Sequence, residues 1–176
     1  RALMQCYGFT GPVDIARRHG AAALAHATAS GDRTLTWWAH WGLAVIEGLS
    51  GNSQAVATHL QEADQLAREL HSPLLQVQTA EIAIEYASGV GEWGEAMARA
   101  DRAIPMARAI APHTLLPRLL VWTSLIHLGR EEFDRARAMC DEAWRLSRAE
   151  EVERAVREGR PPAAGEVHSA ILAHTG

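Results

Sequence analysis

The segment Gly91-Glu-Trp-Gly-Glu-Ala96, followed seven residues later by Ala103, decides the predicted fold of this chain. The same frame recurs with a 40-residue period, in Gly11-Pro-Val-Asp-Ile-Ala16, Gly51-Asn-Ser-Gln-Ala-Val56 and Glu131-Glu-Phe-Asp-Arg-Ala136, with alanines at Ala23, Ala63 and Ala143. A fixed period of about 20–50 residues indicates stacked structural repeats. Such repeats usually present a binding surface and not a catalytic pocket. The period therefore favours a binding function.

Each repeat reads as a pair of helices. The first helix of a pair is rich in large apolar residues and is predicted over 34–50, 74–90 and 114–129. The second helix carries a face of small residues that begins with an aromatic one, as in Trp93, Ala96, Ala100, Ala103 and Ala107. Gly, Pro, Ser and Asp mark the turns between pairs at 29–33, 70–73 and 110–113. We expect the small residues to be buried where neighbouring helices approach closely.

Composition narrows the function classes. The 176 residues are 48% hydrophobic and 22% charged, with a net charge of -4. An acidic balance gives no general surface for nucleic acid, so no direct nucleic-acid partner is predicted. All 17 cationic residues are Arg. The absence of Lys excludes Schiff-base lysine chemistry and a P-loop lysine from this chain.

The candidate chemical groups do not assemble into a reactive set in the sequence. The nine histidines include no two that are three or four residues apart, so no single helix offers paired metal ligands. Cys6 and Cys140 lie far apart in the sequence and are predicted to be free thiols. Glu81 and Glu85 form a carboxylate pair one helical turn apart, but no nucleophile accompanies them. We therefore predict no enzyme activity, no metal and no cofactor.

The repeat frame also sets the predicted boundaries. Helical repeats are expected over 1–150, with a partial first repeat over 1–30. The prolines and glycines near residue 160 predict an exposed loop insertion over 151–165, and a further truncated repeat is expected to start at 166–176. No apolar stretch is long enough to span a membrane and no signal-peptide pattern opens the chain, so we expect a cytoplasmic fragment of a larger protein without a membrane partner.

The repeat signature resembles tetratricopeptide-like repeats. The best copies are Gly91-Glu-Trp-Gly-Glu-Ala96 with Ala103, and Leu128-Gly-Arg-Glu-Glu-Phe-Asp-Arg-Ala136 with Ala143. The resemblance implies an all-α fold, an α-solenoid of antiparallel helix pairs, although the 40-residue period exceeds the family's usual 34. The period and the Ala/Arg-rich helices are also similar to the repeat regions of large bacterial STAND-type signalling ATPases and transcriptional regulators. That likeness implies a protein-interaction or signal-sensing module.

A binding face follows from one polar stripe. Gln78, Glu81, Glu85 and Ser88 share one side of the helix 74–90, and a polar stripe is expected to face solvent. A shift by one repeat in either direction marks the matching lines Trp38, Trp41, Val45, Gly48 and Arg118, Val121, Leu125, Leu128. In the tetratricopeptide-like family this line faces a concave groove. The predicted groove residues are Trp38, Trp41, Gln78, Glu81, Glu85 and Arg118.

Three interpretations of these predicted groove residues stay open. The groove residues are expected to take up a protein or peptide partner, including other domains of the parent chain. The alternative function is a sensor that binds a small-molecule inducer in the concave groove. In a third interpretation, tight curvature or neighbouring repeats bury the line and leave no binding groove.

Overall fold

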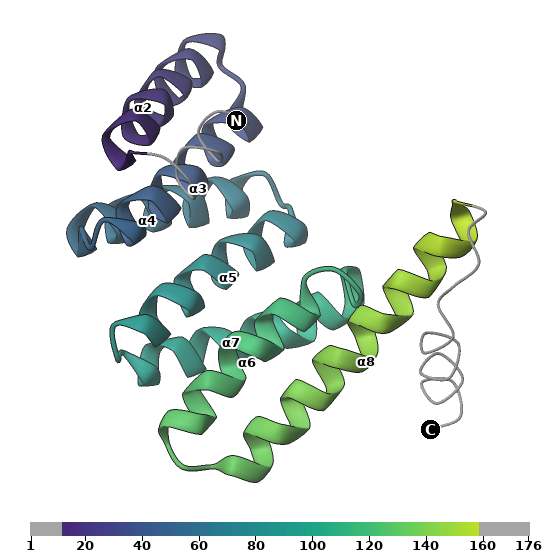
Figure 1. Ribbon diagram of the computed structural model, residues 1–176. Helices are drawn as coiled ribbons and strands as arrows, with labels where there is room; N and C mark the ends of the chain where they lie inside the picture. The colour runs from purple at the N-terminus through teal and green to yellow at the C-terminus, as the bar shows by residue number, and fades with distance from the viewer. Residues whose placement is uncertain (1–11, 159–176) are drawn as a thin grey trace. The chain divides into compact units, whose positions relative to one another are not determined.

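The computed structural model describes residues 12–158, which are all-α. No strand occurs in this range. Its helices, labelled in Figure 1, are α2 (Val13–Ser30), α3 (Arg33–Leu49), α4 (Ser53–Glu69), α5 (Pro73–Gly89), α6 (Trp93–Ile110), α7 (Leu116–Gly129) and α8 (Phe133–Arg157). The predicted helices over 34–50, 74–90 and 114–129 correspond to α3, α5 and α7, with boundaries that differ by two residues or fewer.

The chain divides into two compact units, residues 1–86 and 87–176, with the boundary inside α5. In the first unit α2 packs against α3, and α3 packs against α4. In the second unit α6 packs against α7, and α7 packs against α8. Within each unit, consecutive helices are joined by short turns, so the chain doubles back on itself (Figure 1).

The turns that enter α4, α6 and α8 share one backbone geometry. Each has a residue with left-handed φ, at 73° for Gly51, 84° for Gly91 and 62° for Glu131. In each, the next N–H returns to a carbonyl five residues back, and these bonds are Asn52 to Glu47 at 3.0 Å, Glu92 to Ala87 at 2.8 Å and Glu132 to His127 at 2.9 Å. This is the bond pattern of a Schellman helix end. Glycine takes the left-handed conformation at little cost, whereas Glu131 does so with a side chain present.

Small residues form the contacts between helices, as the sequence predicts. Ala63, Ala103 and Ala143 are all buried, which confirms that expectation. Trp37 is the largest side chain with no exposed surface in the described residues, and it packs against Ala63, Ala67 and Leu75. Trp37 therefore joins α3 to both α4 and α5.

The end of α8 differs from the prediction. Residues 151–157, expected to begin a loop, are the last two turns of α8, which ends at Arg157. The reason is local. Residues 148–157 contain only Arg, Ala, Glu and Val, and the first Gly or Pro after the start of α8 at Phe133 is Gly159. The remainder of the predicted loop, the further repeat over 166–176 and residues 1–11 of the partial first repeat lie outside the described residues.

Candidate functional site

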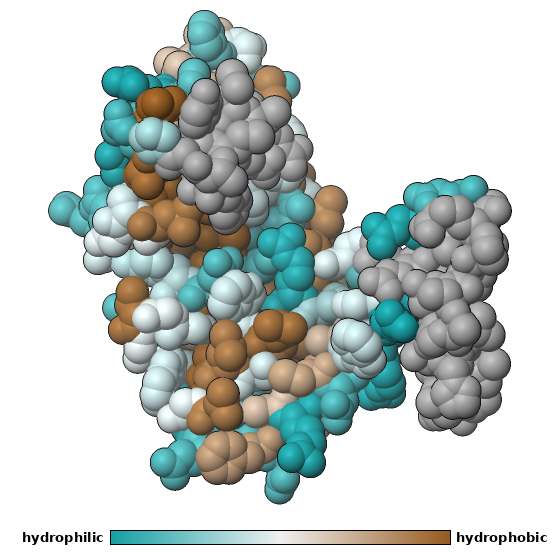
Figure 2. All heavy atoms as spheres, in the orientation of Figure 1, coloured by the Kyte–Doolittle hydropathy of each residue, from teal (hydrophilic) through white to brown (hydrophobic). Residues whose placement is uncertain are grey.

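One face of α7 is an exposed apolar stripe. Val121 is 44% exposed, Leu125 46% and Leu128 51%, and Arg118 begins the same line one turn earlier. The opposite face carries Leu119, Leu120 and Ile126, which are fully buried. Figure 2 shows hydrophobic side chains gathered in the region where α7 lies in Figure 1. The expectation that this line is exposed is confirmed for α7.

The matching line on α3 is half-buried. The Trp38 ring meets Trp37 edge-on at 4.7 Å and Trp41 at 5.5 Å between ring centroids. Trp41 also donates its indole N–H to the backbone carbonyl of Gln78 at 3.1 Å, and packs with residues of both α4 and α5. The structure thus brings Trp38, Trp41 and Gln78 together. Trp41 serves the packing of α3, and this limits how far it is available to a partner.

The line on α5 departs further from the expectation. Glu81 is 1% exposed, so the prediction that this polar stripe faces solvent is wrong at its central residue. Gln78 and Glu85 are half-buried. The physical reason is that α5 is covered on several sides, because Ile82 and Ile84, which point to nearly opposite sides of the helix, are both buried as well. Arg118, the sixth predicted groove residue, is exposed on α7 of the second unit.

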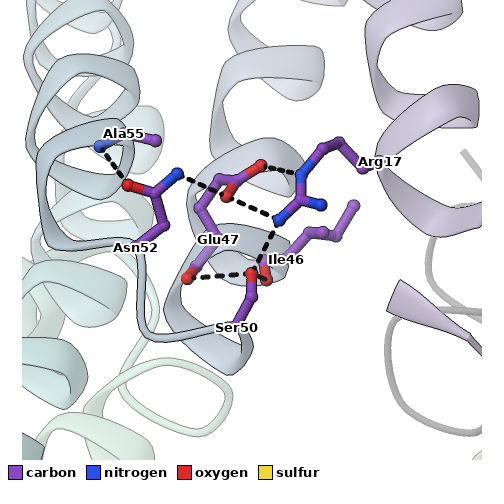
Figure 3. A network of polar contacts seen from close by, with 6 residues as sticks. All are labelled: Arg17, Ile46, Glu47, Ser50, Asn52 and Ala55. Atoms are coloured by element: carbon purple, nitrogen blue, oxygen red, sulfur yellow. Dashed lines mark hydrogen bonds and ion pairs between the residues drawn. The ribbon is translucent and has the colours of Figure 1, made fainter. Parts of the chain in front are cut away.

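A buried carboxylate joins α2, α3 and the start of α4 (Figure 3). Arg17 donates Nε to Glu47 Oε1 at 2.6 Å and Nη2 to Oε2 at 3.0 Å. Asn52 donates its side-chain amide to the same Oε2 at 3.1 Å. The hydrogen bond from Arg17 is the main reason that the pKa of Glu47 lies below its usual value, with burial acting in the opposite direction. These contacts are those of a structural ion pair.

The same two turn positions pair again two repeats further along the chain. His127 Nδ1 lies 2.7 Å from Glu132 Oε2, and Arg135 reaches that oxygen at 3.0 Å. The hydrogen bond with His127 is the main cause that lowers the pKa of Glu132. The sequence analysis predicted neither the Glu47–Asn52 contact nor the His127–Glu132 contact. The shared spacing, from 47 to 52 and from 127 to 132, is the signal that could have found them.

A histidine pair links α3 to α4. His40 Nδ1 and His59 Nδ1 are 3.1 Å apart, and both side chains are half-buried. Burial lowers the pKa of both imidazoles; the neighbouring His59 lowers that of His40 further, whereas Glu62 acts in the opposite direction on both. The search for ligands within one helix missed this pair because its members lie on different helices. No group of three or more possible ligands is arranged to hold a metal ion among residues 12–158.

A hollow of about 580 Å³ lies between α2 and α3. Its walls come from the second half of α2 and the first half of α3. The lining residues are Ala23, His26, Ala27, Ser30, Leu35, Trp38 and Ala39. Most of this lining is apolar, and Trp38 is the one predicted groove residue that contributes to it.

Across the described helices, none has the length and apolar character needed to cross a membrane. Compared with known proteins, the chain matches no family model, no curated protein and no solved structure.

Proposed function

We propose that this chain is a non-catalytic binding module, built as a tetratricopeptide-like α-solenoid with a 40-residue repeat. Three observations support the repeat. The helices α2, α4, α6 and α8 begin at equal intervals of one repeat, at Val13, Ser53, Trp93 and Phe133. The turns that enter α4, α6 and α8 share one backbone geometry. The equivalent alanines of α4, α6 and α8 are buried.

The binding surface of this proposal is the α7 stripe, defined as Arg118, Val121, Leu125 and Leu128. Its three apolar side chains are about half exposed over about two turns of one helix. Contiguous exposed apolar surface usually marks an interaction site, whereas single exposed apolar residues do not. Arg118 is exposed one turn before Val121 and extends the same line, and an apolar surface of this kind fits the apolar face of a partner protein or peptide.

The setting of this module comes from the resemblance to STAND-type bacterial regulators. In this proposal the chain is a cytoplasmic part of a larger signalling protein and holds a protein partner or another domain of its parent chain. It binds neither nucleic acid nor membrane directly. The alternative, a small-molecule inducer in the groove, stays a prediction.

The α7 stripe is tested by a charge placed at its centre. Leu125→Asp changes an exposed side chain, so the fold should survive, while an apolar contact gains an unpaired carboxylate. The full chain and this variant are used to capture proteins from a lysate of the source organism. A protein held by the wild type and lost by Leu125→Asp supports the proposal.

The matched control is Leu35→Asp, which changes an equally exposed leucine of α3. The control should retain the partner. If no captured protein depends on Leu125, or if Leu35→Asp loses the same protein equally, the α7 stripe is not the binding surface.

A further inference from the structure

His40 of α3 and His59 of α4 present their Nδ1 atoms to each other across the contact between the two helices. The two nitrogens are 3.1 Å apart, whereas the ring centroids are 5.3 Å apart and the ring planes are inclined by 52°. The imidazoles therefore meet edge to edge through their nitrogens and are not stacked. Two imidazole nitrogens that bind one tetrahedral zinc ion, each at about 2.0–2.1 Å, lie about 3.3 Å from each other. The observed separation is close to that of a chelating pair.

The protonation state of the two rings also suits a metal ligand. Burial is the main cause that lowers the pKa of both imidazoles below the usual value, so both rings are neutral at pH 7. A neutral imidazole offers the lone pair that a metal ion needs. At this distance one Nδ1 carries a hydrogen and donates it to the other Nδ1. Movement of that hydrogen to Nε2 frees both Nδ1 lone pairs with no change in net charge.

The surroundings of the pair favour a cation and leave room for water. Glu62 lies three residues after His59 on α4, and its negative charge acts on both imidazoles. The same charge attracts a metal ion held between the rings. Both histidines are half-buried, and Glu62 is exposed. Water can therefore complete the coordination of an ion that has two protein donors.

The pairing is specific to this helix contact. The equivalent positions hold Ala80 and Arg99 one repeat later, and Leu120 and Met139 two repeats later. The repeat frame therefore does not require two histidines at these positions.

We propose that His40 and His59 form a binding site for a divalent transition-metal ion of the class of Zn²⁺, Ni²⁺ and Cu²⁺, which ties α3 to α4. Imidazole suits these ions, whereas Mg²⁺ and Ca²⁺ prefer oxygen donors. The sequence prediction of no metal considered ligands on a single helix, and these two lie on different helices. This site goes beyond the proposed binding function and does not depend on the α7 stripe, which belongs to the other unit.

Isothermal titration calorimetry of the full chain with zinc chloride at pH 7.5 tests the site. The wild type should bind zinc saturably. His40→Ala and His59→Ala should each weaken this binding by at least about 10-fold, because loss of even an outer-shell partner of a metal ligand costs that much. His26→Ala removes an exposed histidine of α2 and is the matched control for weak binding to surface histidines. It should bind zinc as the wild type does.

Thermal unfolding gives a second measurement, because an ion that binds the folded state alone raises the melting temperature. Zinc should raise it in the wild type and in His26→Ala, but not in His40→Ala or His59→Ala, and magnesium chloride should raise it in none of them. Far-UV circular dichroism checks that each variant is folded, and His40→Gln and His59→Gln replace any alanine variant that loses helix content.

Three results would overturn the proposal. The first is a wild type that does not bind zinc saturably. The second is unchanged zinc affinity after substitution of either His40 or His59. The third is an equal loss of zinc binding in His26→Ala, which would show that zinc binds surface histidines without preference for the pair.

Discussion

Trp41→Ala should destabilise the first unit strongly, although Trp41 was expected to line a groove. Complete truncation of a buried Trp costs about 3–5 kcal/mol. Because Trp41 is half-buried, about half of this value applies, or roughly 2 kcal/mol. Loss of its hydrogen bond to the Gln78 carbonyl adds about 1 kcal/mol. We therefore expect a loss of about 3 kcal/mol in the free energy of unfolding.

Urea denaturation followed by far-UV circular dichroism measures this loss. Trp144→Ala is the control, because Trp144 is 62% exposed on α8. Its ring lies against the guanidinium of Arg148 on the same helix. The control should change stability by about 0.5 kcal/mol or less. A Trp41→Ala variant as stable as this control would refute the packing role and return Trp41 to the candidate binding residues.

Three further changes test the packing and the titrating groups. Ala103→Leu should overpack the buried face of α6 and cost about 1–3 kcal/mol in urea denaturation; wild-type stability would contradict the buried position. Gly129→Ala should cost about 1 kcal/mol, because a Cβ there would lie 2.8 Å from a tryptophan ring. The equivalent Gly89→Ala meets no atom within 4 Å and should be neutral or stabilising; equal losses at both glycines would refute this reasoning. For His40 and His59, whose pKa values are lowered in the folded state, the unfolded chain takes up protons first, so stability should fall as the pH drops below about 6.5. Melting temperatures between pH 7.5 and 5 should show a weaker pH dependence in His40→Ala, and an unchanged slope would rule out this pair as the cause.

The sequence predicted the elements of the fold because its signals are local. Turn residues and helical periodicity placed α3, α5 and α7 to within two residues, and the small residues at Ala63, Ala103 and Ala143 marked the close helix contacts. The same periodicity predicted the exposed α7 stripe. Only the all-α architecture and these positions are established in this way; the binding roles stay proposals.

Features that depend on two helices escaped the sequence. A polar stripe shows which residues share one side of a helix, but it does not show how many sides neighbouring helices cover, and Glu81 is buried for that reason. The contacts of His40 with His59 and of Arg17 with Glu47 join residues 19 and 30 positions apart. Neither the helical period nor the repeat period predicts such pairs. The length of α8 was not predicted, because the 40-residue period placed the end of the helix near residue 150, whereas the residues up to Arg157 still favour a helix.

The turns that enter α4, α6 and α8 have the same backbone geometry, but they differ in the side chains that hold them closed. At the start of α4 the Asn52 amide donates to the Glu47 carboxylate. At the start of α8 the His127 imidazole is hydrogen-bonded to the Glu132 carboxylate. The middle copy places Ala87 opposite Glu92, and there the backbone bond of 2.8 Å closes the turn. Ala87 is 4% exposed, so an imidazole introduced there by Ala87→His would overpack the contact that the alanine makes. The side-chain pair of one turn is therefore not transferable to the middle turn, whose closure depends on its backbone bond.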